Sequence, residues 1–286
     1  MTRFAIDRSP HGLVVVSGPD ATSFLQSLVS QDLEPVADGT AVPTLLLTPQ
    51  GKLDVAMRAL RVGDDWWLDT DAAYGPRLAD ALTRFRIRVK VELDDRTATT
   101  GLASLVGVDA EVPAVVRALP TRWGDVDGID LLGPRDAVAA ALDSLAADVP
   151  RWDAARFEAF RIEAGVPRLG VDVNDATIPQ EAFLERDAVS FTKGCFLGQE
   201  LVCRIDTRGH VNRYLRRLDV EGGTVPPAGA SVVVDGLERG AVTSAAADPD
   251  ARRVVALAMV RREVEPPASA RVQWDGHDEP VQVGAL

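Results

Sequence analysis

Apolar and polar residues alternate over much of the chain, a pattern typical of β-strands. Helical spacing is confined to a few segments between the alternating ones. Strands are predicted at residues 3–7, 11–17, 42–48, 53–62 and 66–70, with further short strands and turns over 98–133. Helices are predicted from Gly18 onward and over 72–85, 134–147 and 151–165. The last helix ends at Gly165, because glycine is the usual residue just after a helix.

The strictest alternation is found at residues 85–91, Phe-Arg-Ile-Arg-Val-Lys-Val. It predicts a half-buried strand whose polar face carries Arg86, Arg88 and Lys90. The structural interpretation of these cations is a solvent-facing strand surface. The functional interpretation is a local anchor for an acidic ligand tail or a phosphate backbone.

The pattern changes after Gly209. Residues 214–286 are rich in valine, glycine and proline and show no clear helical spacing. Strands are predicted at residues 215–221, 230–235, 240–246, 253–260, 269–274 and 280–284. Short strands at even spacing with turn residues between them indicate a small barrel. We therefore predict one region over 1–211, containing two subdomains, and a barrel domain over 212–286.

Composition agrees with a globular protein of about two domains. The chain has 286 residues, of which 46% are hydrophobic and 26% charged. No apolar run approaches the roughly 20 residues of a membrane-spanning helix. The N-terminal residues lack the apolar core of a secretory signal. These features predict a cytoplasmic protein without membrane association.

Charge and metal-ligating residues exclude several classes of function. The net charge is −12, whereas a broad nucleic-acid surface is normally basic, so stable nucleic-acid binding is not expected. Two cysteines and three scattered histidines provide neither a disulfide framework nor the ligand spacing of a zinc site. No metal is predicted.

Residues 193–209 contain more candidate reactive and ligand-binding residues than any other stretch of the chain. Leu197, Leu201 and Ile205 recur at four-residue spacing, which predicts a helix beginning at Leu197. Glu200, Arg204 and Arg208 repeat at the same spacing on another face. Cys195 is then placed just before the helix, where free N–H groups favour a thiolate, and Lys193 adds to that effect.

Each of these residues also has a structural interpretation. A cysteine is often a small buried apolar residue, and a Glu/Arg/Arg stripe is usually a solvated helix face. Gly194 and Gly198 allow the backbone to approach a neighbour, either protein or ligand. Residue types and spacing alone do not choose between these interpretations.

The stretch resembles the signature of the YgfZ/GcvT folate-binding family, in its YgfZ branch. That signature is Lys-Gly-Cys-aromatic-x-Gly-Gln-Glu, a basic residue four positions on, and Arg-Gly. It is matched here by Lys193, Gly194, Cys195, Phe196, Gly198, Gln199, Glu200, Arg204, Arg208 and Gly209. Further similar segments are residues 18–26, 47–52, 161–165, 179–182 and 240–244. Phe183, where the branch usually has asparagine, and Cys203, where it often has alanine, depart from the pattern.

The resemblance implies an α+β fold, in which mixed strands and helices surround a central cavity and a small β-barrel follows. It also implies tetrahydrofolate as the cofactor, with the carboxylate of Glu163 on the pterin. The alternative is that Glu163 pairs with Arg161 or Arg168 on the surface. Arg204 and Arg208, or less directly Arg86 and Arg88, would hold the folate tail. Gly194, Gly198, Gln199 and Glu200 are the other expected cofactor-binding residues, and Cys195 and Lys193 the reactive ones.

Three functions follow from the resemblance. The first is a folate-binding accessory protein for assembly or repair of iron–sulfur enzymes, including a tRNA-modifying one, with these enzymes as clients of Cys195. One cysteine cannot hold a cluster alone, so a partner, a dimer or Cys203 would contribute. The second is a folate-dependent aminomethyl or one-carbon transferase. The third is a scaffold that has lost its ligand.

The transferase hypothesis depends on residues after Gly51. The enzymatic relatives carry an Asp-Asp pair there. A gapless comparison places Val55 and Ala56 at those positions, and one gap would bring Asp54 into register. Whether the chain turns over a substrate therefore stays open at this point.

Overall fold

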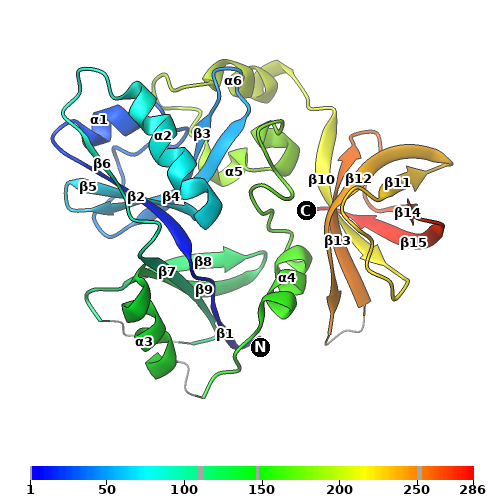
Figure 1. Ribbon diagram of the computed structural model, residues 1–286. Helices are drawn as coiled ribbons and strands as arrows, with labels where there is room; N and C mark the ends of the chain where they lie inside the picture. Colours follow the sequence, from blue (N-terminus) through cyan, green and yellow to red (C-terminus); the bar gives the residue numbers. More distant parts are fainter. Residues whose placement is uncertain (1, 109–112, 146–147, 250–252) are drawn as a thin grey trace. The chain divides into compact units, whose positions relative to one another are not determined.

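The computed structural model describes residues 2–108, 113–145, 148–249 and 253–286 (Figure 1). The chain forms two compact units. The first contains Met1–Thr121, Asp127–Arg151 and Leu184–Thr207. The second contains Arg122–Val126, Trp152–Phe183 and Arg208–Leu286. The predicted domain boundary near Asn212 stays a prediction.

Two antiparallel sheets precede the barrel, in the orders β3-β4-β5-β2-β6 and β1-β7-β9-β8. The five-stranded sheet consists of β2 (His11–Ser17), β3 (Ala41–Leu47), β4 (Leu53–Val62), β5 (Asp65–Asp71) and β6 (Glu92–Asp95). The four-stranded sheet consists of β1 (Phe4–Asp7), β7 (Thr100–Val106), β8 (Arg117–Trp123) and β9 (Val126–Pro134). In β4, Leu53, Val55, Met57 and Ala59 are buried in alternation, which confirms the predicted period of two.

The helices of the first unit are α1 (Ala21–Gln26), η1 (Ala72–Tyr74), α2 (Gly75–Phe85), α3 (Arg135–Leu145), α5 (Glu185–Ala188) and α6 (Gln199–Arg208). The second unit contains α4 (Ala154–Glu163) and η2 (Pro179–Ala182). Val138 and Leu142 of α3 pack on Leu105 and Leu131 of the four-stranded sheet, so the helix buries an apolar face. Residues 146–147, predicted as the end of that helix, lie outside the described residues. None of the helices in the described ranges has the length and apolar character needed to span a membrane.

The predicted strand over residues 85–91 is wrong. Phe85 is the last residue of α2, and residues 86–91 form a loop before β6, which begins only at Glu92. Arg88 has a left-handed backbone, with φ of 58°, which interrupts an extended chain, and the Ile87 side chain is 71% exposed. Val91 alone inserts into the core at this point. The alternating apolar and basic residues belong to an exposed loop and do not mark a strand with one buried face.

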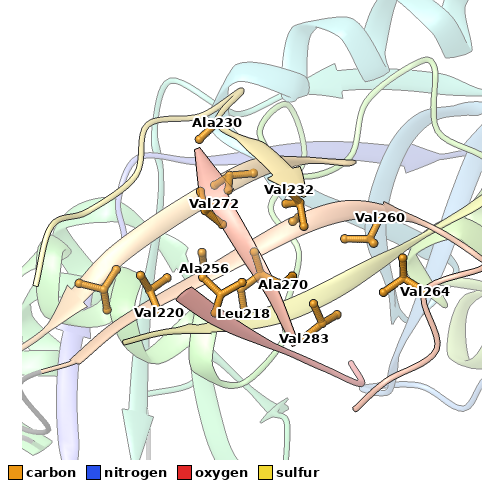
Figure 2. Close-up of a cluster of buried hydrophobic side chains, with 14 residues drawn as sticks. Leu218, Val220, Ala230, Val232, Ala256, Val260, Val264, Ala270, Val272 and Val283 are labelled. Carbon is orange, nitrogen blue, oxygen red and sulfur yellow. The ribbon is translucent and has the colours of Figure 1, made fainter. Parts of the chain in front are cut away.

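The second unit contains a closed six-stranded barrel in the order β10-β13-β12-β11-β14-β15, as the valine-rich pattern predicts. Its strands are β10 (Arg213–Val220), β11 (Ser231–Val234), β12 (Leu237–Asp248), β13 (Arg253–Arg261), β14 (Ala268–Trp274) and β15 (His277–Gly284). Figure 2 shows small apolar side chains filling the interior, among them Leu218, Val232, Val260 and Val272. Burying a side chain of this kind contributes about 1.5–3 kcal/mol, so this core alone accounts for a large favourable term.

Candidate functional site

Lys193 connects residues 190–199 to the segment that follows α1, residues 29–31, through hydrogen bonds. Its ammonium group donates hydrogen bonds to the carbonyl oxygens of Val29 and Gln31, both at 2.8 Å. The nitrogen also lies 5.5 Å from the ring centre of Phe196. Burial lowers the pKa of Lys193 to about 8, although Asp32 and nearby acid charge oppose the shift. Lys193 therefore has a clear positioning role beside its predicted reactive one.

At Gly198 and Gly51, two segments that resemble the family, residues 193–209 and 47–52, come into contact. A Cβ atom on Gly198 would meet the Thr48 carbonyl oxygen at 2.4 Å, and one on Gly51 would meet the Gly198 oxygen at 2.8 Å. Both glycines also have positive φ, 78° and 75°. The neighbour that Gly198 approaches is therefore the turn at residues 48–52. At Gly194, by contrast, nothing lies within 4 Å of the Cβ position.

Helix α6 begins at Gln199, two residues later than the pattern predicts. The left-handed Gly198 ends the preceding turn and prevents an earlier start. The side-chain oxygen of Gln199 accepts a hydrogen bond from the Phe196 amide at 3.0 Å, which closes this turn. Cys195 consequently precedes the helix by four residues and does not adjoin its first turn. The N–H groups at the start of α6 therefore favour a thiolate at Cys195 less than the sequence predicted.

The polar stripe of α6 faces outward. Glu200 and Arg204 form an ion pair of 2.5 Å, with side chains 86% and 64% exposed. Arg208 is exposed at the end of the helix. This geometry is that of a solvated helix face, and such a pair contributes little to stability. Roles for Glu200, Arg204 and Arg208 toward a cofactor stay predictions.

The two thiols differ in accessibility. Cys195 is exposed, whereas Cys203 is partly buried within α6. Burial and the charge of Asp206 raise the pKa of the Cys203 thiol, so it holds less thiolate near neutral pH. We expect iodoacetamide to modify Cys195 several-fold faster than Cys203 in the folded protein. Mass spectrometry of peptides at early times measures both rates, and faster labelling of Cys203 would refute the expectation.

Glu163 lies in the second unit and ends α4, as predicted. Its Oε1 atom binds Arg253 of β13 at 2.7 Å, not Arg161 or Arg168. Its Oε2 atom is buried and accepts no hydrogen bond from the described residues. Arg253 also pairs with Asp219 at 3.3 Å. A buried acceptor without a donor is unfavourable, and a ligand N–H group would correct this.

Arg161 has a structural role that the sequence did not reveal. It is 3% exposed and binds Asp172 at 2.8 Å and Glu158 at 2.6 Å. It also donates to the hydroxyl group of Ser244 in β12 at 3.0 Å. These contacts fix the end of α4 against the barrel and so position Glu163. Asp172 was missed because no local motif surrounds it.

A second buried network lies in the first unit and was also missed. Arg58 binds Asp69 and Asp130 at 2.7 Å each, and both carboxylates are almost fully buried. His11 contacts Asp69 at 2.9 Å, and Ser104 donates to Asp130 at 2.5 Å. The cation beside Asp69 and the His11 hydrogen bond hold the pKa of that carboxyl well below its usual range, despite its burial. Arg58 and Asp69 are cross-strand partners on the sheet face opposite to Met57 and Leu68, so the period of two gave no signal of their burial.

Asp54, the residue on which the transferase hypothesis depends, is engaged elsewhere. It accepts from Arg77 at 2.6 Å, and its side chain is only 14% exposed. Val55, the next residue of the strand, points to the other face of the sheet and is buried in the core. Among the described residues, no cluster of three or more His, Cys, Asp or Glu side chains is placed to hold a metal ion.

Comparisons with known proteins agree with this architecture. No family model matches the chain. The chain is 26% identical over 286 residues to the "tRNA-modifying protein YgfZ" of Escherichia coli O157:H7, covering 93% of this chain and 87% of that relative. The protein of the same name from Shigella sonnei is also 26% identical, over 94% of this chain and 90% of its own length. The glycine cleavage system aminomethyltransferase T of Bartonella henselae superposes with a TM-score of 0.83 at 20% identity, covering 99% of this chain and 85% of the other.

The chain therefore shares its fold with the aminomethyltransferase T structure, which confirms the predicted mixed fold with a C-terminal barrel. Over about 93% of its length the chain is similar, at 26% identity, to proteins named YgfZ. Its relatives are called tRNA-modifying proteins.

Proposed function

We propose that the protein is a cytoplasmic, tetrahydrofolate-binding accessory protein for the assembly or repair of iron–sulfur enzymes, tRNA-modifying ones included. The observation that carries the folate part is the Glu163 carboxylate, which has one oxygen on Arg253 and the other buried without a donor. A pterin presents an N–H group beside an amino group, and a carboxylate can accept from both. Bound tetrahydrofolate would supply one-carbon carrier chemistry.

The contacts around Arg253 are compatible with a ligand on Glu163. Because Arg253 also reaches Asp219 at 3.3 Å and Asp248 at 3.9 Å, it keeps anionic partners if Glu163 turns to a pterin. Arg161 holds the helix end that carries Glu163, so the carboxylate is positioned in advance. The roles expected of Arg204 and Arg208 toward the tail carboxylates, and of Gly194, Gly198, Gln199 and Glu200 toward the cofactor, are proposed from the family resemblance.

The accessory role is proposed from Cys195, which is exposed, and from the names of the relatives. An exposed thiol can contact a client protein or a cluster in transit, whereas a folate transfer reaction has no need of it. The transferase alternative is less favoured, because the Asp54 carboxylate forms an ion pair with Arg77. Assaying tetrahydrofolate-dependent release of formaldehyde or ammonia separates the two functions.

The folate assignment is tested with Glu163→Gln. The variant replaces one acceptor oxygen by a donor that would face another donor, and we expect tetrahydrofolate affinity to fall by on the order of 1–3 kcal/mol in calorimetry. Glu263→Gln is the matched control, since Glu263 is 56% exposed and forms a loose pair of 3.9 Å with Arg262. Denaturation curves of both variants establish that folding is retained. Equal affinity of Glu163→Gln and wild type would remove Glu163 from the site.

A further inference from the structure

Three arginines form a row across one face of the barrel. Arg213 of β10 and Arg261 of β13 are direct cross-strand partners, so their side chains share one face. Strand β12 is the next neighbour of β13, with Gly240 opposite Val260. Arg239 precedes Gly240, and it lines the same concavity as Arg213 and Arg261. We call Arg213, Arg261 and Arg239 the arginine row.

The arginine row is electrostatically unfavourable by itself, because like charges at directly opposite positions destabilise a sheet. Arg213 is compensated by Glu181, with contacts of 2.8 and 3.2 Å. For Arg239 and Arg261, no ion pair or hydrogen bond from the side chain is found within the described parts of the chain. Two adjacent guanidinium groups thus lack an anion in a protein whose net charge is −12.

The arginine row lines a concavity of about 420 Å³. This volume falls in the range of small-molecule sites. The other lining residues are Asn212, Glu238, Gly240, Ala241 and Met259. Ala241 and Met259 are cross-strand partners and supply an apolar wall beside the cations. The only carboxylate of the lining, Glu238, accepts from the Ser231 hydroxyl at 3.2 Å.

We propose that this concavity binds a small molecule carrying two adjacent phosphate groups, a diphosphate. Arg261 and Arg239 belong to the neighbouring strands β13 and β12 and line one concavity, so they offer two planar, charged donor groups to two phosphates of one ligand. A single carboxylate would compensate only one of them. The apolar wall of Ala241 and Met259 would contact the remainder of the ligand.

The size of the ligand follows from the charge of the protein. Electrostatic interactions in salt decay over about 8 Å, so a compact diphosphate interacts mainly with the arginine row. A long polyanion such as RNA would extend over surface belonging to a chain of net charge −12. This argument favours the small ligand over the polymer, and it is independent of folate binding at Glu163.

The test uses the full chain and inorganic pyrophosphate as the probe, in calorimetry at physiological salt. We expect saturable binding that Arg261→Gln and Arg239→Gln each weaken about tenfold or more, because each removes charge-assisted hydrogen bonds. Arg262→Gln is the control: Arg262 is adjacent in sequence but does not line the concavity, and it should bind like wild type.

Thermal unfolding separates loss of the site from loss of the fold. Arg261→Gln removes a like-charge contact, so its Tm without pyrophosphate should equal or exceed that of wild type. Pyrophosphate should raise the Tm of wild type and not that of the variant. Absence of binding at millimolar pyrophosphate, or equal binding by both variants and wild type, would overturn the proposal. Poly(U) RNA bound through these arginines, with pyrophosphate unable to compete, would overturn the ligand class.

Discussion

Arg58→Met is expected to destabilise the protein by on the order of 3–5 kcal/mol, since the substitution leaves the carboxylates of Asp69 and Asp130 buried without their shared cation. Methionine keeps much of the volume, so the loss comes from charge and hydrogen bonding more than from a cavity. Chemical denaturation, with the midpoint and slope fitted together, measures the change. A loss of this size is a large fraction of the stability of an ordinary domain.

The effect should depend on pH in a defined direction. Pairing lowers the pKa of Asp69 below its unfolded value of about 3.9, so the stabilisation is present above that pH. It is lost as the pH falls toward the lower folded value. The contribution of Asp69 to the stability of wild type should therefore be constant near neutral pH and be lost below about pH 4.

Arg96→Met provides the matched control. Arg96 and Asp94 form a pair of the same length, 2.7 Å, but their side chains are 45% and 59% exposed. Solvent screening limits such a pair to about 0–1 kcal/mol. Equal losses from the two arginine variants would show that the buried network contributes no more than a surface ion pair.

Cys195→Ala is expected to abolish the support of iron–sulfur enzyme activity in cells that lack their own copy of the protein. The fold and the tetrahydrofolate affinity should remain near wild type, because the thiol is exposed and, among the described residues, makes no hydrogen bond of the kind that Lys193 makes. The measurement combines an enzyme assay in the cells with calorimetry on the purified variant.

Cys203→Ala is the control for this experiment, because it removes the other thiol, from within α6. Activity should survive that change. Normal activity of cells carrying Cys195→Ala would reduce Cys195 to a packing residue. A fall in folate affinity would instead place the thiol against the ligand.

The sequence predicted those helices and strands in which apolar residues recur at a regular spacing. Short valine-rich segments at even spacing, with turn residues between them, predicted the barrel strands, and the end of α4 near Glu163 followed from Gly165. Residues 85–91 show the limit of this reasoning, since the same alternation arises in an exposed loop. Whether a face is buried depends on what packs against it, and alternation alone carries no such information.

The candidate site was predicted only where its residues are adjacent in the chain. Residues 193–200 were found together, but the carbonyl partners of Lys193 are more than 160 positions away. Arg58 and Asp130 are 72 positions apart, and Arg161 and Ser244 are 83 apart. Such pairs form because a buried charge requires a partner, and the tertiary fold decides which residue supplies it.

The left-handed turn at Arg88 also bears on self-association. Strand β6 forms the outer edge of its sheet, and its sequence, Glu-Leu-Asp-Asp, carries three carboxylates. Had the strand continued back through Lys90, Arg88 and Arg86, one edge would carry a cationic half and an anionic half. Two copies running antiparallel would then attract each other along it. Because the turn removes the cationic half, the remaining edge strand carries mainly carboxylates, of which Asp94 is paired with Arg96, and their like charge disfavours edge-to-edge pairing with a second copy.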